Sequence, residues 1–169
     1  MAELRNDFIT LRPLHVDYVE AYLAAFSATV KRALHVEDIS SERDYLLERI
    51  EQQKHASIFF YCIFENQSNT LIGAIEIRDE HTSAGQLYCW LHENYWGKGY
   101  FQQAVALAAQ EYFAQNKTNM ISAYVDVTNI RSYRALKKCG FADYGLHQGP
   151  HGKQYVLVMR MKSGPARVA

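Results

Sequence analysis

A strand-like segment, two glycines around one lysine and an immediate helix form the feature that most limits how this chain folds. Residues 87–91 read as a strand, Gly97-Lys98-Gly99 as a tight turn, and a helix is predicted to start at Tyr100. Glycines before a helix leave backbone N–H groups free, and with the helix dipole these favour a phosphate. The turn predicts either a plain connection or a phosphate-binding site. Its helix carries an inward apolar stripe at helical spacing: Phe101, Ala104, Val105, Ala108 and Tyr112.

Residue spacing excludes two nucleotide-binding motifs at this turn. A P-loop needs Gly-Lys followed by Ser or Thr, but Lys98 is followed by Gly99. The dinucleotide fingerprint needs a third glycine at the position that Gln102 occupies. What remains is a phosphate site that works without a metal ion.

The rest of the chain predicts an α+β fold with a mixed, mostly antiparallel sheet of six to seven strands, flanked by about four helices. Short connections make the strands between residues 58 and 91 antiparallel neighbours. We expect Ser40 and Ser41 to open the second helix, Asn129 to cap the last one, and Gly140 to end it in the left-handed conformation. The expected strands are 8–12, 58–64, 71–77, 86–91, 120–127, 141–146 and 154–161, and the expected helices 14–26, 42–54, 100–116 and 129–139.

The composition is that of a globular protein: 169 residues, 49% hydrophobic and 21% charged. We expect one domain over residues 1–162 and a tail over 163–169.

The 18 basic and 18 acidic residues cancel, which argues against binding nucleic acid through bulk charge. No apolar run approaches the ~20 residues of a membrane span, and the first residues lack a signal peptide. We therefore expect a cytoplasmic protein with three reduced cysteines, Cys62, Cys89 and Cys139.

Two motifs, at the right separation and in the right order of elements, resemble those of the GNAT N-acetyltransferases. The first is Asn94-Tyr95-Trp96-Gly97-Lys98-Gly99-Tyr100 with the strand before it, and the second is Asn129-x-x-Ser132 with Lys138-Cys139-Gly140-Phe141. The opening residues 9–14, Ile-Thr-Leu-Arg-Pro-Leu, resemble the RimJ/RimL-type branch. The likeness covers residues 8–161.

This resemblance implies acetyl-CoA as the donor, an amine as the acceptor and no metal. It implies that backbone amides of the glycine turn bind the pyrophosphate, that Leu91 and His92 face the pantetheine arm and polarise the thioester carbonyl, and that Asn129 and Ser132 line the side where the thiol leaves. The cofactor-binding residues so implied are Leu91, His92, Trp96, Gly97, Lys98, Gly99, Tyr100, Phe101, Asn129 and Ser132.

The sequence departs from the family pattern at the proton donor. Leu136 occupies the position where many relatives have a tyrosine acid, and Asn94 replaces an Arg or Gln before the first glycine. Because Ser132 and Tyr133 precede Leu136 by four and three residues, we expect one of them to contact the departing sulfur. The alternatives are a hydroxyl at a helix start for Ser132 and a core position for Tyr133.

For the base, Glu76 is expected in the strand beside the one that carries Leu91, either relaying a proton or attracting the acceptor, or else facing solvent. His92 and Glu93 are further candidates. An α-amine, with a pKa of about 7.8, would demand less of a base than lysine at about 10.4. Acceptor specificity is expected in residues 28–41, where Glu37 and Asp38 would border the pocket or stay solvated, and in a loop over 147–153.

Two other functions stay open from the sequence. The missing tyrosine allows a module that binds acyl-CoA without catalysis, and a purely structural or partner-binding domain would bind no CoA at all. The expected partners are a peptide N-terminus or a small-molecule amine, with no nucleic acid or membrane, and an exposed strand edge or helix face would support a homodimer.

Overall fold

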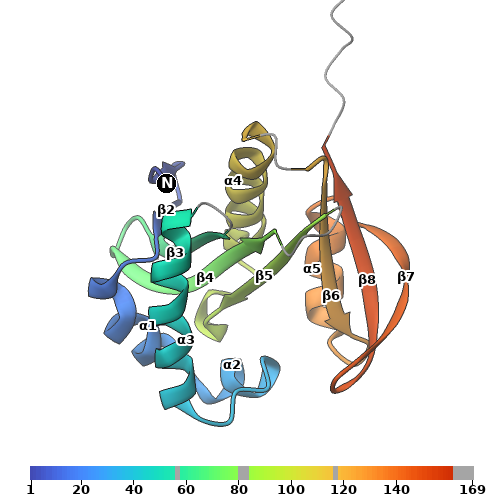
Figure 1. Ribbon diagram of the computed structural model, residues 1–169, viewed down its shortest axis with the longest axis horizontal. Helices are drawn as coiled ribbons and strands as arrows, with labels where there is room; N and C mark the ends of the chain where they lie inside the picture. Colours follow the sequence, from blue (N-terminus) through green and yellow to red (C-terminus); the bar gives the residue numbers. More distant parts are fainter. Residues whose placement is uncertain (56–57, 80–83, 116–117, 162–169) are drawn as a thin grey trace, which may run out of the picture.

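The computed structural model describes residues 1–55, 58–79, 84–115 and 118–161; the expected tail and the loop expected at 81–83 lie outside them. The described strands form one mixed sheet in the order β1-β2-β3-β4-β5-β6-β8-β7 (Figure 1). Within the described residues the sheet has eight strands, against the six to seven expected. The additional strand is β1, whose two residues are too few to show the alternating pattern of a strand. The strands are β1 (Leu4–Arg5), β2 (Ile9–Pro13), β3 (Ile58–Glu65), β4 (Thr70–Arg78), β5 (Gly85–Leu91), β6 (Met120–Asp126), β7 (Ala142–Gly149) and β8 (Gly152–Arg160).

Five α-helices are present in the described residues, one more than expected. The additional helix, α2, lies within residues 28–41, the segment expected to govern acceptor specificity. It is capped by Ser27, whose Oγ accepts a hydrogen bond from the Val30 N–H at 3.1 Å. The helices are α1 (Val19–Ala25), α2 (Ala28–Ala33), α3 (Ile39–Gln52), α4 (Tyr100–Ala114) and α5 (Ile130–Lys138), with short 3-10 turns η1 (Val16–Tyr18), η2 (Gln53–His55) and η3 (Glu93–Tyr95).

The expected start of α3 was wrong by three residues. Its cap is Asp38, which accepts from the Ser40 N–H at 2.9 Å, so that Ser40 and Ser41 lie inside the first turn. An aspartate caps as well as a serine, and the exposed Asp38 carboxylate is engaged by the Ser40 backbone and hydroxyl. Asn129 and Gly140, by contrast, take the expected roles at the two ends of α5: Asn129 Oδ1 accepts from the Ser132 N–H, and Gly140 has φ +93°.

The sheet separates two apolar cores, because alternate residues of each strand face opposite sides. Phe59, Tyr61 and Ile63 of β3 belong to the core under α4 and α5. Phe60 and Cys62 point the other way, into the core under α1, α2 and α3. Figure 1 shows α3 in front of the sheet and α5 behind it.

The only parallel pair among the described strands, β5 with β6, is very short. It holds just Gly85 opposite Ile121 and Gln86 opposite Ser122, although both strands continue for several residues. Figure 1 shows the two strands starting together and then spreading apart. The sheet is thus open along the second half of β5, an opening that we call the β5–β6 divergence.

The loop expected at residues 147–153 is instead a β-hairpin. His147 lies in β7, paired with Gln154, and Gly149 pairs with Gly152 across a two-residue turn that contains His151. Pro150 suggested a break, but the turn holds it outside the ladder, where its missing N–H costs no hydrogen bond.

Candidate functional site

The glycine turn between η3 and α4 is open and points its amides outward. Gly97 has φ +74° and Gly99 φ +84°, which strongly favour glycine. A Cβ added at either position would meet nothing within 4 Å. Within the described part of the chain, no acceptor binds the backbone N–H groups of residues 97–101. These amides, with the N-terminus of the 15-residue helix α4, make a place for an anion.

The backbone of β5 offers further free groups beside this turn. The His92 N–H donates to the Ile72 carbonyl of β4 at 2.9 Å. Because polar groups alternate in direction along an antiparallel strand, the Leu91 N–H and the backbone groups of Cys89 point away from β4, into the β5–β6 divergence. An extended chain could therefore pair with this edge as a strand would. Leu91, rather than His92, presents the backbone N–H.

The far side of the divergence is the start of α5, which Arg131 connects to the glycine turn. Its guanidinium lies 3.8 Å from the ring centroid of Trp96, a cation–π contact. Trp96 in turn donates its indole N–H to the Leu91 carbonyl at 2.8 Å. Arg131 therefore adds a positive charge beside the open amides. Nothing in its spacing along the sequence marks it as a site residue.

The two candidates for the acid are placed differently. The Tyr133 hydroxyl donates to Asp143 Oδ1 at 2.9 Å, and its ring packs on Tyr155 of β8 with centroids 4.7 Å apart. The hydrogen bond to Asp143 raises the pKa of Tyr133. The Ser132 hydroxyl forms no hydrogen bond within the described residues, so it is available beside the Asn129 cap. Leu136 is buried.

The histidine and acid candidates near the turn have structural contacts. His92 Nδ1 accepts from the Asn94 N–H at 3.2 Å and so caps η3. Glu93 Oε2 accepts from the Ser27 hydroxyl at 2.5 Å, joining η3 to the cap of α2, and this hydrogen bond lowers the pKa of Glu93. Within the described residues, no group of three or more His, Cys, Asp and Glu side chains could hold a metal ion.

A cavity of about 170 Å³ lies on the other face of the sheet, between α1, α3 and the strands β4 and β5. We call it the α3 cavity. Aromatic rings make much of its wall, and two carboxylates, Glu42 and Glu76, line it. Trp90 lines the cavity, and the next residue, Leu91, carries the backbone N–H that points into the β5–β6 divergence. The lining residues are Tyr22, Leu34, Val36, Glu42, Tyr45, Phe60, Ala74, Ile75, Glu76, Arg78, Tyr88, Cys89 and Trp90.

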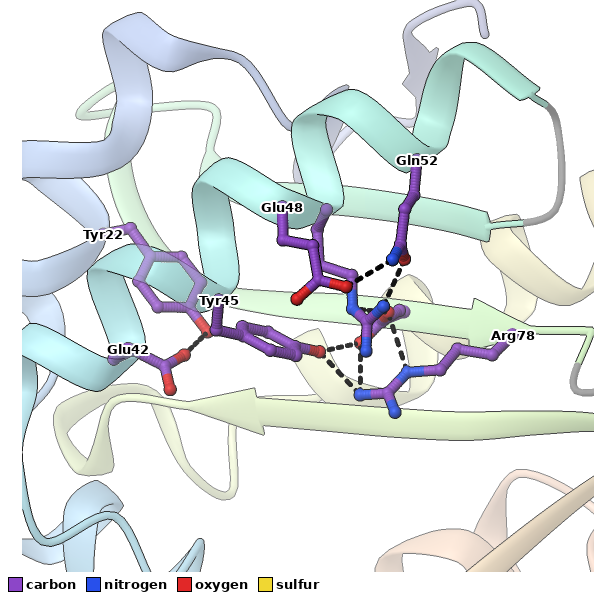
Figure 2. Close-up of polar contacts among 8 residues, drawn as sticks. Tyr22, Glu42, Tyr45, Glu48, Gln52 and Arg78 are labelled. Carbon is purple, nitrogen blue, oxygen red and sulfur yellow. Dashed lines mark hydrogen bonds and ion pairs between the residues drawn. The ribbon is translucent and has the colours of Figure 1, made fainter.

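Glu76 is buried, so the expectation that it could face solvent was wrong; only 3% of its surface is exposed. Its Oε1 accepts from Arg78 Nε at 2.8 Å and lies 3.3 Å from Arg49 Nε. Its Oε2 accepts from the Tyr45 hydroxyl at 2.5 Å and from Arg78 Nη2 at 3.1 Å. Figure 2 shows Tyr45 and Arg78 converging in this network. Both oxygens are already engaged by cations and a phenol.

Glu42, which was not among the residues expected at the site, has a simpler environment. Its Oε1 accepts from the Tyr22 hydroxyl at 2.9 Å (Figure 2). Tyr22 in turn accepts from the indole N–H of Trp90 at 2.9 Å. Burial raises the pKa of Glu42, the Tyr22 hydrogen bond lowers it, and the charge of Glu76 raises it further. Glu42 opens a helix in the sequence, and only the tertiary fold shows that it lines a cavity.

The two segments expected to govern the acceptor lie together. The His35 ring, after α2, stacks on that of His151 in the β7–β8 turn, with centroids 4.2 Å apart. His35 Nε2 also lies 2.9 Å from Asp126 Oδ2 at the end of β6. Through these two contacts, the segment after α2 is joined to β6 and to the β7–β8 turn, on the far side of the β5–β6 divergence.

The three cysteines are all free thiols. Burial raises the pKa of Cys62 to about 12 and that of Cys139 to about 11. Burial and the neighbouring Cys139 also raise the pKa of Cys89, which lines the cavity. All three thiols are therefore protonated near neutral pH and are poor nucleophiles.

No helix in the described ranges has both the length and the apolar character needed to cross a membrane. Comparison with curated proteins gave no match in sequence. Solved structures match the fold closely at low identity. RimL, a ribosomal L7/L12 α-N-protein acetyltransferase, has a TM-score of 0.83 at 16% identity, covering 95% of this chain and 94% of its own.

Two further structures have the same fold. The ribosomal-protein-S5-alanine acetyltransferase of Vibrio fischeri has a TM-score of 0.79 at 16% identity, over 96% of this chain and 98% of that one. The microcin C7 self-immunity acetyltransferase MccE, solved with acetyl-CoA and AMP, has a TM-score of 0.80 at 19% identity, over 92% and 94%.

The family itself is shown by the sequence. Residues 9–142 match the acetyltransferase (GNAT) domain, a range that begins with β2 and ends at the start of β7. It includes the glycine turn, the β5–β6 divergence and all of α5. The chain therefore belongs to the GNAT acetyltransferase domain family.

Proposed function

We propose that this protein binds acetyl-CoA in the β5–β6 divergence and transfers the acetyl group to a primary amine. The observation that carries the proposal is the combination of an open left-handed turn at Gly97 and Gly99 with a strand edge left unpaired beside it. The turn would bind the diphosphate through its amides, and the β5 edge would pair with the pantetheine arm. MccE was solved with acetyl-CoA, and a second RimL structure contains coenzyme A, which supports this assignment.

In this proposal the Leu91 N–H donates to the thioester carbonyl oxygen and stabilises the negative charge that develops there. Arg131 lies beside the turn and would offset phosphate charge. Ser132, whose hydroxyl is uncommitted in the described structure, would donate a hydrogen bond to the departing sulfur. Tyr133 is the weaker candidate because its hydroxyl is already donated to Asp143.

Direct attack by the amine in a ternary complex fits the residues better than an acyl-enzyme route. The cysteines have raised pKa values, so none is an activated thiolate. Holding amine and thioester together in one site supplies a large part of the rate enhancement. The amine would approach from the α3 cavity, whose wall includes Trp90, the residue before Leu91.

The test is a turnover assay with acetyl-CoA and a panel of acceptors: Ala-Ala-Ala amide, spermidine and kanamycin. We expect thiol release that depends on both substrates, together with an acetylated product in mass spectrometry. Saturable acetyl-CoA binding by calorimetry, with no acetylated product from any amine, would instead support the binding module. No binding at all would support a structural domain and end the proposal.

A further inference from the structure

Two carboxylates line the α3 cavity, and their surroundings differ sharply. Glu76 faces two guanidinium groups and a phenol, so both of its oxygens already hold hydrogen bonds. Glu42 has one partner, the neutral Tyr22 hydroxyl, and no ion pair within the described residues. Glu42 is therefore the carboxylate that still has room for an incoming proton.

The net charge of the cluster formed by Glu42, Arg49, Glu76 and Arg78 also favours proton loss from the acceptor. Arg49 and Arg78 carry two positive charges, and Glu42 with Glu76 carries two negative ones when both are ionised. An acceptor that enters as an ammonium would add one uncompensated positive charge. Transfer of a proton from the ammonium to Glu42 keeps that total and produces the neutral amine that direct attack on a thioester requires. The cluster returns to neutral when Glu42 passes the proton to solvent.

A hydrogen-bonded chain leads from this carboxylate to the reacting strand. The Trp90 indole N–H donates to Tyr22, and Tyr22 donates to Glu42, each at 2.9 Å. Trp90 precedes Leu91, whose N–H points into the divergence. Trp90 and Tyr22 are both buried, so this connection is fixed by packing as well as by hydrogen bonds.

The size of the cavity limits what enters it. Sites for drug-sized ligands measure roughly 300–1,000 Å³, whereas this one measures about 170 Å³. It accommodates the amino group of an acceptor and a few neighbouring atoms, with the remainder outside. Aromatic rings in its wall, including Tyr22, Phe60 and Trp90, suit the apolar carbons next to an amine.

From this arrangement we propose that Glu42 is the general base that accepts a proton from the amine of the acceptor in the α3 cavity. This rests on the proposed function. The ammonium gives one proton to the Glu42 carboxylate, and the neutral nitrogen attacks the acetyl carbon. The new C–N bond forms as the C–S bond breaks, and the sulfur keeps the electron pair. The second proton of the nitrogen neutralises the thiolate, and Glu42 returns its proton to solvent.

Several charged or titratable groups face Glu42 and contribute to its pH dependence. Those that line the α3 cavity with it are Tyr22 of α1, Tyr45 of α3, Glu76 and Arg78 of β4, and Tyr88 and Cys89 of β5. Arg49 of α3 acts through its ion pair with Glu76. The Tyr22 hydrogen bond favours the ionised carboxylate, whereas the charge of Glu76 disfavours it. Tyr22→Phe removes only the first of these influences, so it should move the acidic limb of kcat/KM to higher pH.

The test compares kcat, KM and the pH profile of wild type and Glu42→Gln, with whichever panel amine the wild type acetylates. We expect kcat at pH 7 to fall at least 100-fold and to recover with rising pH as the amine loses its own proton. Glu48→Gln, on the exposed face of the same helix, is the matched control and should keep kcat within two-fold. Acetyl-CoA affinity by calorimetry should be unchanged in both variants.

An unchanged kcat in Glu42→Gln would overturn the inference, as would a rise in KM alone, which means that Glu42 only attracts the ammonium. A loss of acetyl-CoA affinity in Glu42→Gln as large as its loss of kcat would overturn it too, because the substitution would then disturb the acetyl-CoA site. Failure of the proposed function is distinguishable, since the wild type would then acetylate no amine. Glu42→Asp, which keeps a carboxylate, should recover part of the lost kcat.

Discussion

The indole Nε1–H of Trp96 donates a hydrogen bond to the backbone carbonyl of Leu91 at 2.8 Å. This bond fixes the end of β5 against the glycine turn that follows it. The Leu91 N–H and the open amides of residues 97–101 are therefore held in one relative position before any ligand arrives. Such preorganisation is what makes hydrogen-bond donors effective toward a developing negative charge.

Replacing Gly99 with alanine should weaken acetyl-CoA binding at least 10-fold. The added Cβ occupies the open space over the turn, and φ +84° strains any residue other than glycine by about 1–2 kcal/mol. Gly140→Ala is the matched control. Gly140 has φ +93° and equally open surroundings, but it follows the C-terminal end of α5 and is not part of the glycine turn. Both variants should lose similar stability in denaturant titrations, and only Gly99→Ala should lose affinity in calorimetry. Equal affinities would contradict the role of the turn.

Removing the hydroxyl of Ser132 and removing that of Tyr133, both in the first turn of α5, should have different effects on kcat. We expect Ser132→Ala to lower kcat by about 10-fold, because the departing sulfur loses a hydrogen-bond donor. Tyr133→Phe should keep kcat within two-fold, because its hydroxyl is donated to Asp143. Steady-state kinetics at saturating acetyl-CoA test both. A large loss in Tyr133→Phe with full activity in Ser132→Ala would reverse the assignment.

Glu76→Gln should destabilise the protein by about 3 kcal/mol. The substitution leaves Arg49 and Arg78 without their shared carboxylate, and breaking a buried ion pair from one side typically costs 3–5 kcal/mol. Glu48→Gln on the exposed face of α3 should change stability by less than about 0.5 kcal/mol. The free energy of unfolding in urea measures both. A change in Glu76→Gln no greater than in Glu48→Gln would show that the network contributes little.

Glu42→Gln should be at least as stable as wild type at pH 7. Because the pKa of Glu42 is raised in the folded state, ionising it opposes folding. That cost is absent below the unfolded pKa, about 4.3, and grows as the pH rises through the folded value. The advantage of the variant should therefore shrink toward pH 4. Unfolding free energies across pH 4–8 measure this, and an advantage that grew toward acid would refute the assigned direction.

Local signals in the sequence were sufficient for much of this fold. The apolar stripe from Phe101 to Tyr112 predicted α4, and Asn129 and Gly140 marked the two ends of α5 because capping depends on a few neighbouring residues. The open conformation of Gly97 and Gly99 likewise followed from glycine in a tight turn. Helix α2 was missed because six residues are too few to establish a helical period.

The cavity could not be predicted in the same way. Glu42 and Glu76 are 34 positions apart in the chain, and nothing local shows that one is held by two arginines while the other has only a tyrosine. Glu76 was considered alone, in a strand, where a solvent-facing position is as natural as a buried one. Arg131 was missed for the same reason, since its contact with Trp96 joins segments 35 residues apart.

The most direct test of the proposed acetyl-CoA site is a crystal structure of the protein with coenzyme A. We expect the diphosphate on the backbone amides of residues 97–101, with no cation between, and the pantetheine arm extended along β5 at Leu91 and Cys89. Coenzyme A bound elsewhere, or a β5–β6 divergence left empty at saturating concentration, would contradict it.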